Sequence, residues 1–461
     1  MESLQPFNKE EFLKFLSKPY FILRKEHDRW YILVPKFINE SYGFLIDETE
    51  TYRVYLVTKY TSWVMKLPEE LKKELNLENP KHIAYIEEDE LKVYPSEYLP
   101  ILLEKLKKFV YIKDGKIKIR KDRMWDAIVT LVREGILPYK PKPVDEKDLL
   151  ERYPKFELRP YQRRAWEAFL KFGRIGVFYP PGAGKTYVSL YIMSRIAGPK
   201  LITVPSRTLI EHWKSKIEEL TYMEEGEYII CTYHKALKKY MQKSFTLAIY
   251  DECHHIPADM FSALFTLKAK YSIMLSGSPM REDGRHAYLF ALAGFPVGLG
   301  AWEWEQLLKE GVIKKPRVVV FVVPSLERKI ELAIYLFNRA EGKTFIFCDS
   351  IDLGMALSKV LNVPFVYGKT KDRLEILETY DKVIVSRVGD EGIDITNLDT
   401  IIEVDFLKGS RRQSMQRNGR LLHSRFSGTH YIIMTCEEFE RYRKRLLPLY
   451  ERNIPVKIYQ L

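Results

Sequence analysis

Residues Phe178 to Thr186 read FYPPGAGKT and stand between an apolar run, RIGV, and a helical pattern, YVSLYIMSRI. A strand, a glycine-containing loop and a helix in that order form the context that a phosphate-binding loop requires. Lys185 is expected to neutralise the β- and γ-phosphates, and the Thr186 hydroxyl to bind Mg²⁺. Tyr179 stands where the general pattern has its first glycine. We therefore predict that ATP and Mg²⁺ bind at Gly182, Ala183, Gly184, Lys185 and Thr186.

Short runs rich in Val, Ile and Phe alternate with helical patterns on both sides of this loop. One series continues with KLITVP and TLAIYDE, and a second begins near Pro316 with RVVVFVV, TFIFCDS, PFVYG, DKVIVS, TIIEVDF and HYIIMT. This alternation is typical of βαβ units around a buried parallel sheet. We predict an α/β fold with two parallel-sheet lobes, over residues 151–305 and 306–461.

Residues 1–150 show a different pattern of apolar runs and carry no chemical motif. Strand-like runs occur at Trp30 to Pro35 and Tyr52 to Thr58, and a helix-like stretch runs from Tyr98 to Phe109. The segment from Leu137 to Val144 holds three prolines, which break helices and stiffen a connection. We predict a smaller α+β N-terminal domain that ends at this segment.

The composition favours a polyanionic partner inside the cell. Lys and Arg number 74 against 62 acidic residues, a net charge of +12, although a solvated basic surface is the simpler alternative. The four cysteines are far apart and form no CxxC pair, so a reducing, cytoplasmic setting is expected. The apolar runs are too short to span a bilayer, so we expect no membrane association.

A pair of carboxylates follows the run TLAIY. We expect Asp251 to hold the Mg²⁺ shell and Glu252 to orient and deprotonate the attacking water, because phosphoryl transfer needs a positioned nucleophile. Metal binding by Cys253, His254 and His255 is the competing interpretation, but adjacent residues cannot easily chelate one ion.

This DExH box, together with a later arginine-rich segment, resembles superfamily 2 helicases, which implies two RecA-like lobes. In Leu158-Arg-Pro-Tyr-Gln162 the resemblance implies that Gln162 reads the adenine edge. The segments TVPSRTL and TYH resemble strand-end motifs that grip a nucleic-acid backbone, and Ser276-Gly-Ser278 resembles the motif that couples hydrolysis to lobe movement. The residues that the resemblance implies for contact or coupling are Pro205, Ser206, Arg207, Thr232, Ser276 and Ser278.

The segment Arg281-Glu-Asp-Gly-Arg285, together with DECHHIPADMF, resembles the XPB group of DNA repair and transcription helicases, particularly its archaeal members. In that group the tripeptide helps to open the duplex. The resemblance therefore implies that role for Arg281, Glu282 and Asp283. Three charged residues in a loop are common, so the tripeptide counts only because of its position.

Two further motifs resemble those of the family's second lobe. Val388 to Asp394 resembles a motif that contacts ATP and DNA, and Ser410 to Arg420 resembles the arginine motif, with Arg420 as the arginine finger. A basic amphipathic helix on the surface is the alternative. The nucleotide-binding residues implied here are Gly392, Asp394, Gln416 and Arg417.

The chain departs from the family in two places. The last arginine of the arginine motif is His423, with Arg425 nearby, and the stretch from Asp283 to Phe345 is too short for the thumb-like insertion of many relatives. The N-terminal domain matches a damage-recognition-like domain only by position.

The resemblance implies an ATP-dependent DNA helicase or translocase with 3′ to 5′ polarity, acting in nucleotide excision repair or DNA opening. The alternatives are a duplex translocase and a nucleotide-switched scaffold for a structure-specific nuclease partner. A small-molecule kinase explains neither the second lobe nor the basic charge.

Overall fold

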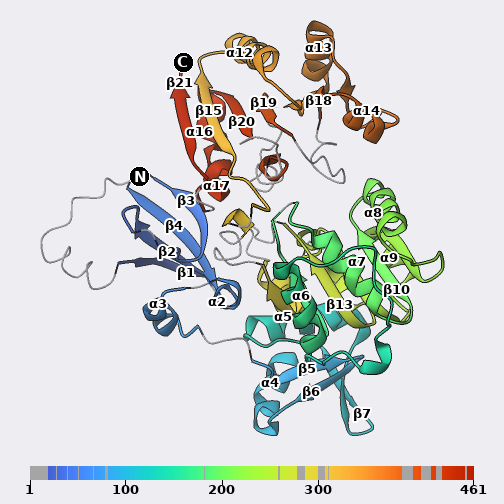
Figure 1. Cartoon of the computed structure of the whole chain (residues 1–461). Coiled ribbons are helices and arrows are strands. Elements are labelled where there is room, and N and C mark those ends of the chain that lie inside the picture. Colours follow the sequence, from blue (N-terminus) through green and yellow to red (C-terminus); the bar gives the residue numbers. More distant parts are fainter. Residues whose placement is uncertain are drawn as a thin grey trace, which may run out of the picture.

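The protein is a mixed α/β molecule, seen in a computed structural model (Figure 1). The structure describes residues 19–26, 29–38, 40–49, 51–65, 67–77, 81–180, 182–257, 260–277, 286–298, 307–309, 311–386, 398–405, 417–421, 428–451 and 454–461.

The first lobe is built on a six-stranded parallel sheet with the order β11-β10-β12-β13-β9-β14. Its strands are β9 (Arg174–Val177), β10 (Lys200–Val204), β11 (Tyr228–Thr232), β12 (Phe245–Tyr250), β13 (Ala269–Leu275) and β14 (Phe295–Val297). Its helices are α6 (Pro160–Phe172), α7 (Lys185–Arg195), α8 (Arg207–Leu220), α9 (Tyr233–Lys239) and α10 (His286–Ala293).

Both faces of this sheet are buried, because apolar residues occupy most positions of its inner strands. In β12, Leu247 and Ile249 belong to the core under α6, α7 and α8, whereas Ala248 and Tyr250 belong to the core under α9 and α10. Successive side chains of a strand point to opposite faces, so a continuous apolar run requires a layer of helices on each side.

The second lobe has a seven-stranded parallel sheet with the order β17-β18-β16-β19-β20-β15-β21. Its strands are β15 (Arg317–Val323), β16 (Thr344–Phe347), β17 (Phe365–Val366), β18 (Lys382–Val385), β19 (Thr400–Glu403), β20 (Thr429–Thr435) and β21 (Val456–Gln460). Its helices are α12 (Leu326–Arg339), α13 (Ile351–Leu361), α14 (Arg373–Thr379), α16 (Cys436–Tyr442) and α17 (Leu447–Glu451), with the 3₁₀ helix η7 (Arg443–Leu446).

Two small antiparallel sheets precede the lobes. The first small sheet has the order β1-β2-β4-β3, with strands β1 (Phe21–Glu26), β2 (Arg29–Pro35), β3 (Phe44–Glu48) and β4 (Tyr52–Thr58) and helices α2 (Thr61–Val64) and α3 (Glu69–Glu74). The second small sheet has the order β5-β6-β8-β7, with strands β5 (Ala84–Glu87), β6 (Glu90–Val93), β7 (Val110–Lys113) and β8 (Lys116–Ile119) and helices α4 (Leu99–Leu106) and α5 (Met124–Arg133).

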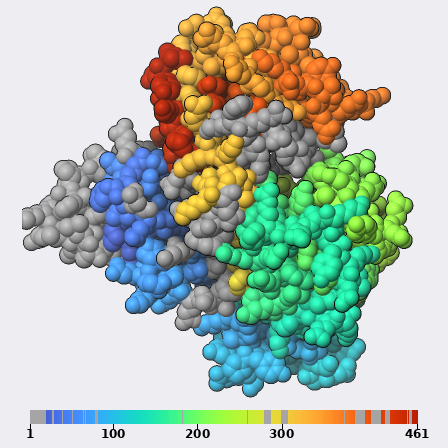
Figure 2. All heavy atoms as spheres, in the orientation of Figure 1, coloured from blue at the N-terminus to red at the C-terminus, as the bar shows by residue number. Residues whose placement is uncertain are grey.

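The two small sheets dock on different lobes (Figure 2). Leu447 of α17 lies in the core of the first small sheet, and Lys444 forms an ion pair with Asp47 of β3 at 2.9 Å. On the other side, Trp125 of α5 stacks on Phe265 of the first lobe with ring centroids 5.4 Å apart. The N-terminal region therefore contacts both lobes.

The predicted fold class is confirmed: two RecA-like parallel sheets follow a smaller α+β region. The strands predicted near Trp30 to Pro35 and at Tyr52 to Thr58 form β2 and β4, and the predicted N-terminal helix forms α4. The domain boundaries at residues 150 and 305 stay predictions. In the described ranges, no helix combines the length and apolar character needed to cross a bilayer.

Candidate active site

One edge of the first lobe's sheet gathers the predicted motifs. Its strands are parallel, so the segments that leave their carboxyl ends emerge at the same edge, where such sheets bind ligands. The segments at this edge are residues 182–186 after β9, Ser276 after β13, Asp251 and Glu252 after β12, residues 205–207 after β10, and Thr232 at the end of β11.

The phosphate loop turns through two glycines in left-handed conformations. Gly182 has φ 76° and Gly184 φ 80°, a region that glycine enters without steric cost. Helix α7 begins at Lys185, directly after this turn. The Lys185 ammonium lies 3.2 Å from the carbonyl oxygen of Tyr179, inside the loop. The backbone therefore has the shape that lets amide groups and a lysine surround an anion.

Three side chains tie this loop to α6. The Tyr161 hydroxyl donates to the carbonyl of Ala183 at 2.8 Å, and the Tyr179 hydroxyl donates to the carbonyl of Tyr161 at 2.8 Å. Tyr179 is buried and fills the core where the general pattern has glycine. The buried Gln162 accepts from the Arg159 N–H at 3.0 Å and donates to Ala183 at 3.4 Å. Adenine recognition by Gln162 stays a prediction, because its amide joins α6 to the loop here.

Asp251 lies at the end of β12 with both carboxylate oxygens held. The indole N–H of Trp213 donates to Oδ2 at 2.8 Å, and the backbone N–H of Glu252 donates to Oδ1 at 2.9 Å. Burial raises the pKa of Asp251, and the Trp213 hydrogen bond and the Lys185 charge offset part of this shift. A buried carboxylate beside the loop fits a hard cation such as Mg²⁺.

Glu252 adopts a left-handed backbone conformation, with φ 48°, that turns the chain sharply away from the strand. Its carboxylate is 28% exposed and lies 3.3 Å from Nδ1 of His254. The same nitrogen lies 2.9 Å from Oγ of Ser276. His254 thus connects the carboxylate pair to the motif that follows β13.

The predicted nucleic-acid contacts lie at the other end of this edge. Ser206 is the N-cap residue of α8, and its buried Oγ has no hydrogen-bond partner among the described residues. Arg207, which follows it, is exposed, and Pro205 is half-buried. Thr232 caps α9 by accepting from the N–H of Lys235 at 3.3 Å. Helix α8 therefore presents an N-terminus whose side-chain cap is not made, a position that favours an anion.

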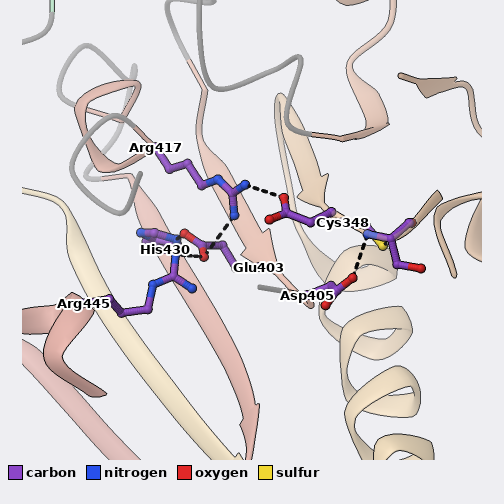
Figure 3. A network of polar contacts seen from close by, with 8 residues as sticks. Cys348, Glu403, Asp405, Arg417, His430 and Arg445 are labelled. Atoms are coloured by element: carbon purple, nitrogen blue, oxygen red, sulfur yellow. Dashed lines mark hydrogen bonds and ion pairs between the residues drawn. The ribbon is translucent and has the colours of Figure 1, made fainter. Parts of the chain in front are cut away.

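In the second lobe, Arg417 is fully buried (Figure 3). Its guanidinium contacts Asp349 at 2.9 Å and Glu403 at 3.2 Å, and it lies 4.5 Å from the ring centre of Phe347. In this arrangement Arg417, which the sequence predicts as a nucleotide contact, forms ion pairs inside the lobe. Its role at the nucleotide stays a prediction.

Arg420, the predicted arginine finger, is half-buried in the same turn. Its backbone N–H donates to the carbonyl of Arg417 at 3.1 Å, so a hydrogen bond joins the two residues. The remaining predicted site residues lie outside the described residues: Ser278, Arg281, Glu282, Asp283, Gly392, Asp394 and Gln416, as do His423 and Arg425.

Sequence reasoning missed the residues that position the predicted ones. Trp213 sits in an amphipathic helix pattern, and nothing in that pattern distinguishes it from a core residue. Glu403 carried a usable signal, because a carboxylate inside the apolar run TIIEV is buried and so needs a cationic partner.

Comparison with known families matches both lobes. The Type III restriction enzyme, res subunit family matches residues 155–281, and the ERCC3/RAD25/XPB C-terminal helicase family matches residues 301–442. These matches confirm the predicted resemblance to the XPB helicases.

Named proteins with similar sequences also resemble the XPB and Rad25 helicases. A protein of Haloarcula marismortui named Rad25 is 29% identical over 390 residues, which cover 73% of this chain and 62% of that protein. The DNA 3′–5′ translocase XPB2 of Sulfurisphaera tokodaii is 27% identical over 350 residues, covering 59% of this chain and 80% of the relative. The chain spans about three fifths of the length of the first relatives it matches.

Among solved structures, S. cerevisiae Dbp5 bound to RNA and ADP BeF3 aligns with a TM-score of 0.52 at 14% identity, covering 65% of this chain and 89% of that one. The DEAD-box helicase Mss116 bound to ssRNA and UDP-BeF aligns with a TM-score of 0.51 at 14% identity, covering 72% of this chain and 80% of that one. At this identity the alignments establish the two-lobe fold.

Proposed function

We propose that this chain, which resembles the XPB helicases over both of its RecA-like lobes, is an ATP-dependent DNA translocase or helicase. The observation that carries the proposal is the single sheet edge at which the phosphate loop, Asp251, Glu252 and Ser276 emerge together. Relatives named as DNA 3′–5′ helicases and translocases support the direction 3′ to 5′, and a Danio rerio relative named as a subunit of a general transcription and DNA repair factor supports a setting in repair or DNA opening.

The first lobe has the groups that ATP hydrolysis needs. The amides of the loop and Lys185 would hold the phosphates, and Thr186 with Asp251 would hold Mg²⁺, which supplies charge neutralisation when bound. Glu252 is partly exposed, which supports the proposal that it would accept the proton of an attacking water. Arg420 would complete the site from the second lobe, so that hydrolysis depends on lobe closure.

DNA would run along the same edge of the first lobe. The N-terminus of α8, with the buried Ser206 hydroxyl and the exposed Arg207, is a suitable site for a backbone phosphate. The net charge of +12 favours a polyanion. Contacts of this kind read the backbone, so we expect little sequence preference.

The decisive experiment measures ATPase activity with single-stranded, duplex, forked and bubble DNA, with RNA as control. We expect stimulation by DNA that weakens as salt concentration rises, because cations set against phosphates release counterions. Activity that ignores every nucleic acid would contradict the proposal. ATP binding with no turnover on any DNA would instead favour the scaffold for a nuclease partner.

A second assay separates unwinding from duplex tracking. Strand displacement and triplex displacement are measured on the same preparation. Replacing Arg281, Glu282 and Asp283 together by alanine is expected to reduce strand displacement and to spare the DNA-stimulated ATPase, because hydrolysis is assembled elsewhere. Equal loss of both activities, or of neither, would rule out a wedge at this tripeptide.

A further inference from the structure

A buried cluster of charges lies at the end of β19 in the second lobe (Figure 3). The carboxylate of Glu403 is fully buried and contacts three potentially cationic side chains: Arg445 at 2.5 Å, His430 at 2.8 Å and Arg417 at 3.2 Å. Burial alone raises the pKa of Glu403, but the charges of Arg445 and Arg417 reverse the shift and hold the pKa well below its ordinary value. The group is therefore ionised throughout the working pH range.

The contacts of Glu403 reach three separate elements. Arg417 belongs to the arginine-motif turn, residues 417–421, Arg445 belongs to η7, and His430 belongs to β20. A neutral, apolar replacement of such a cluster is often as stable as the ion pairs. Stability alone is therefore a weak reason for Glu403, two arginines and a histidine to meet in the core of the lobe.

The arginine-motif turn depends on this cluster for its position. The Arg417 guanidinium contacts the Glu403 carboxylate at 3.2 Å and donates to the Asp349 carboxylate at 2.9 Å. The Arg420 N–H is bonded to the carbonyl of Arg417, so fixing Arg417 also fixes the turn that carries Arg420.

The other end of the cluster reaches the N-terminal region. Arg445 is flanked in η7 and α17 by Lys444, which pairs with Asp47, and by Leu447, which lies in the core of the first small sheet. Lys444, which contacts the first small sheet, therefore directly precedes Arg445, whose guanidinium contacts Glu403.

We infer that Glu403 is a positioning residue for the proposed ATPase: through Arg417 and Arg445 it braces the arginine-motif turn against η7 and so sets the direction of Arg420. The inference rests on the proposed function. Because Glu403 would act through the position of Arg420, and Arg417 is turned into the interior of the lobe, we expect the effect on the catalytic step and not on ATP binding.

The test compares Glu403→Gln with a matched control in the same lobe. Glu438→Gln removes a carboxylate of α16 that lies 2.7 Å from the buried Lys329. For Glu403→Gln we expect kcat of the DNA-stimulated ATPase to fall about tenfold, with KM for ATP unchanged within about twofold, because a misplaced group costs rate and not ground-state binding. For Glu438→Gln we expect both constants to stay near those of the unaltered chain.

Two further measurements keep the inference testable on its own. Glu403→Asp keeps the charge and is expected to recover part of kcat, which covers the case in which Glu403→Gln folds poorly. Hydrogen exchange of a peptide spanning residues 417–421 is expected to accelerate in Glu403→Gln and not in Glu438→Gln, whether or not the chain hydrolyses ATP. An unchanged kcat in folded Glu403→Gln, an equal loss in both glutamine variants, or unchanged exchange of residues 417–421 would overturn the inference.

Discussion

The two lobes share a parallel-sheet architecture but differ in how deeply several of their charged side chains are buried. In the first lobe, Lys185 and Glu252 are partly exposed at the sheet edge, and Glu252 is placed by a left-handed turn of its own backbone. In the second lobe, Glu403, Arg417 and Arg445 are fully buried and contact one another. In the first lobe these two charges stay accessible at the sheet edge, whereas in the second lobe the three charges connect elements of the lobe's interior.

This difference predicts which property each substitution changes. A partly exposed charged group contributes little to folding, so its replacement is expected to change catalytic activity and not stability. A buried ion pair that loses one partner leaves an uncompensated charge, so its loss changes stability. Replacing Lys185 or Glu252 is therefore expected to change activity alone, whereas replacing Glu403 is expected to change the free energy of unfolding as well.

The largest expected effect is on turnover, in the first lobe. Lys185→Ala is expected to abolish ATP turnover by weakening phosphate binding, and Glu252→Gln to lower kcat by roughly 10²–10⁴-fold while ATP binding is kept, because only the base is removed. Both variants are expected to unfold at the same urea concentration as the unaltered chain. Hydrolysis at the parental rate by folded Glu252→Gln would refute the catalytic role.

A smaller loss is expected from the loop backbone. In Gly184→Ala, a Cβ would overlap the amide of Gln162 at a positive φ, which costs about 1–3 kcal/mol and distorts the loop. We expect the affinity for ATP, measured with a fluorescent nucleotide, to fall about tenfold. Gly115→Ala is the matched control, because Gly115 has φ +72° and open space around its Cβ. Equal losses of affinity in both variants would point to a general folding defect.

The next effect concerns stability, in the second lobe, and it depends on pH. The folded pKa of Glu403 lies below the ordinary value of 4.5, so this carboxylate stabilises the fold above that pH and loses its contribution as the pH falls toward the folded value. Glu403→Gln is therefore expected to cost about 3 kcal/mol at pH 7.

The cost of Glu403→Gln is expected to shrink only below the ordinary carboxyl pKa. Urea unfolding of both proteins at pH 7, pH 5 and about pH 3.5 checks the sign. A difference that grew on acidification would mean that the cluster stabilises the protonated form of Glu403.

The smallest expected effect is at the junction between the two small sheets. The buried Tyr60 hydroxyl lies 3.0 Å from the carbonyl of Val132 and 3.2 Å from that of Ile136, so it ties the end of the first small sheet to α5. Tyr60→Phe is expected to cost about 1–2 kcal/mol in unfolding and to leave the basal ATPase unchanged. Tyr31→Phe, at an exposed hydroxyl, is the control and is expected to be neutral. If Tyr60→Phe were also neutral, the hydroxyl would not contribute to holding the two small sheets together.

Much of the fold could be predicted from the sequence because the patterns that indicate it are local. The apolar runs that gave β9, β10 and β12 are separated by helical patterns, and this rhythm is enough to indicate parallel sheets. Two edge strands were missed: β14 and β21 lie at the margins of their sheets, and four of the five residues of β21 are exposed, so no apolar run marks β21. The docking of the two small sheets on different lobes also left no local signal.

The sequence by itself determined the strand, loop and helix around Lys185 and the carboxylate pair after β12, because neighbouring residues carry those patterns. Tertiary structure alone decided what holds these groups in place. Trp213 and Asp251 are separated by 38 residues, and Glu403 and Arg445 by 42, and each pair meets only when helices pack on a finished sheet. Local preference sets the elements of a chain, whereas a contact between distant residues depends on packing, which no single segment encodes.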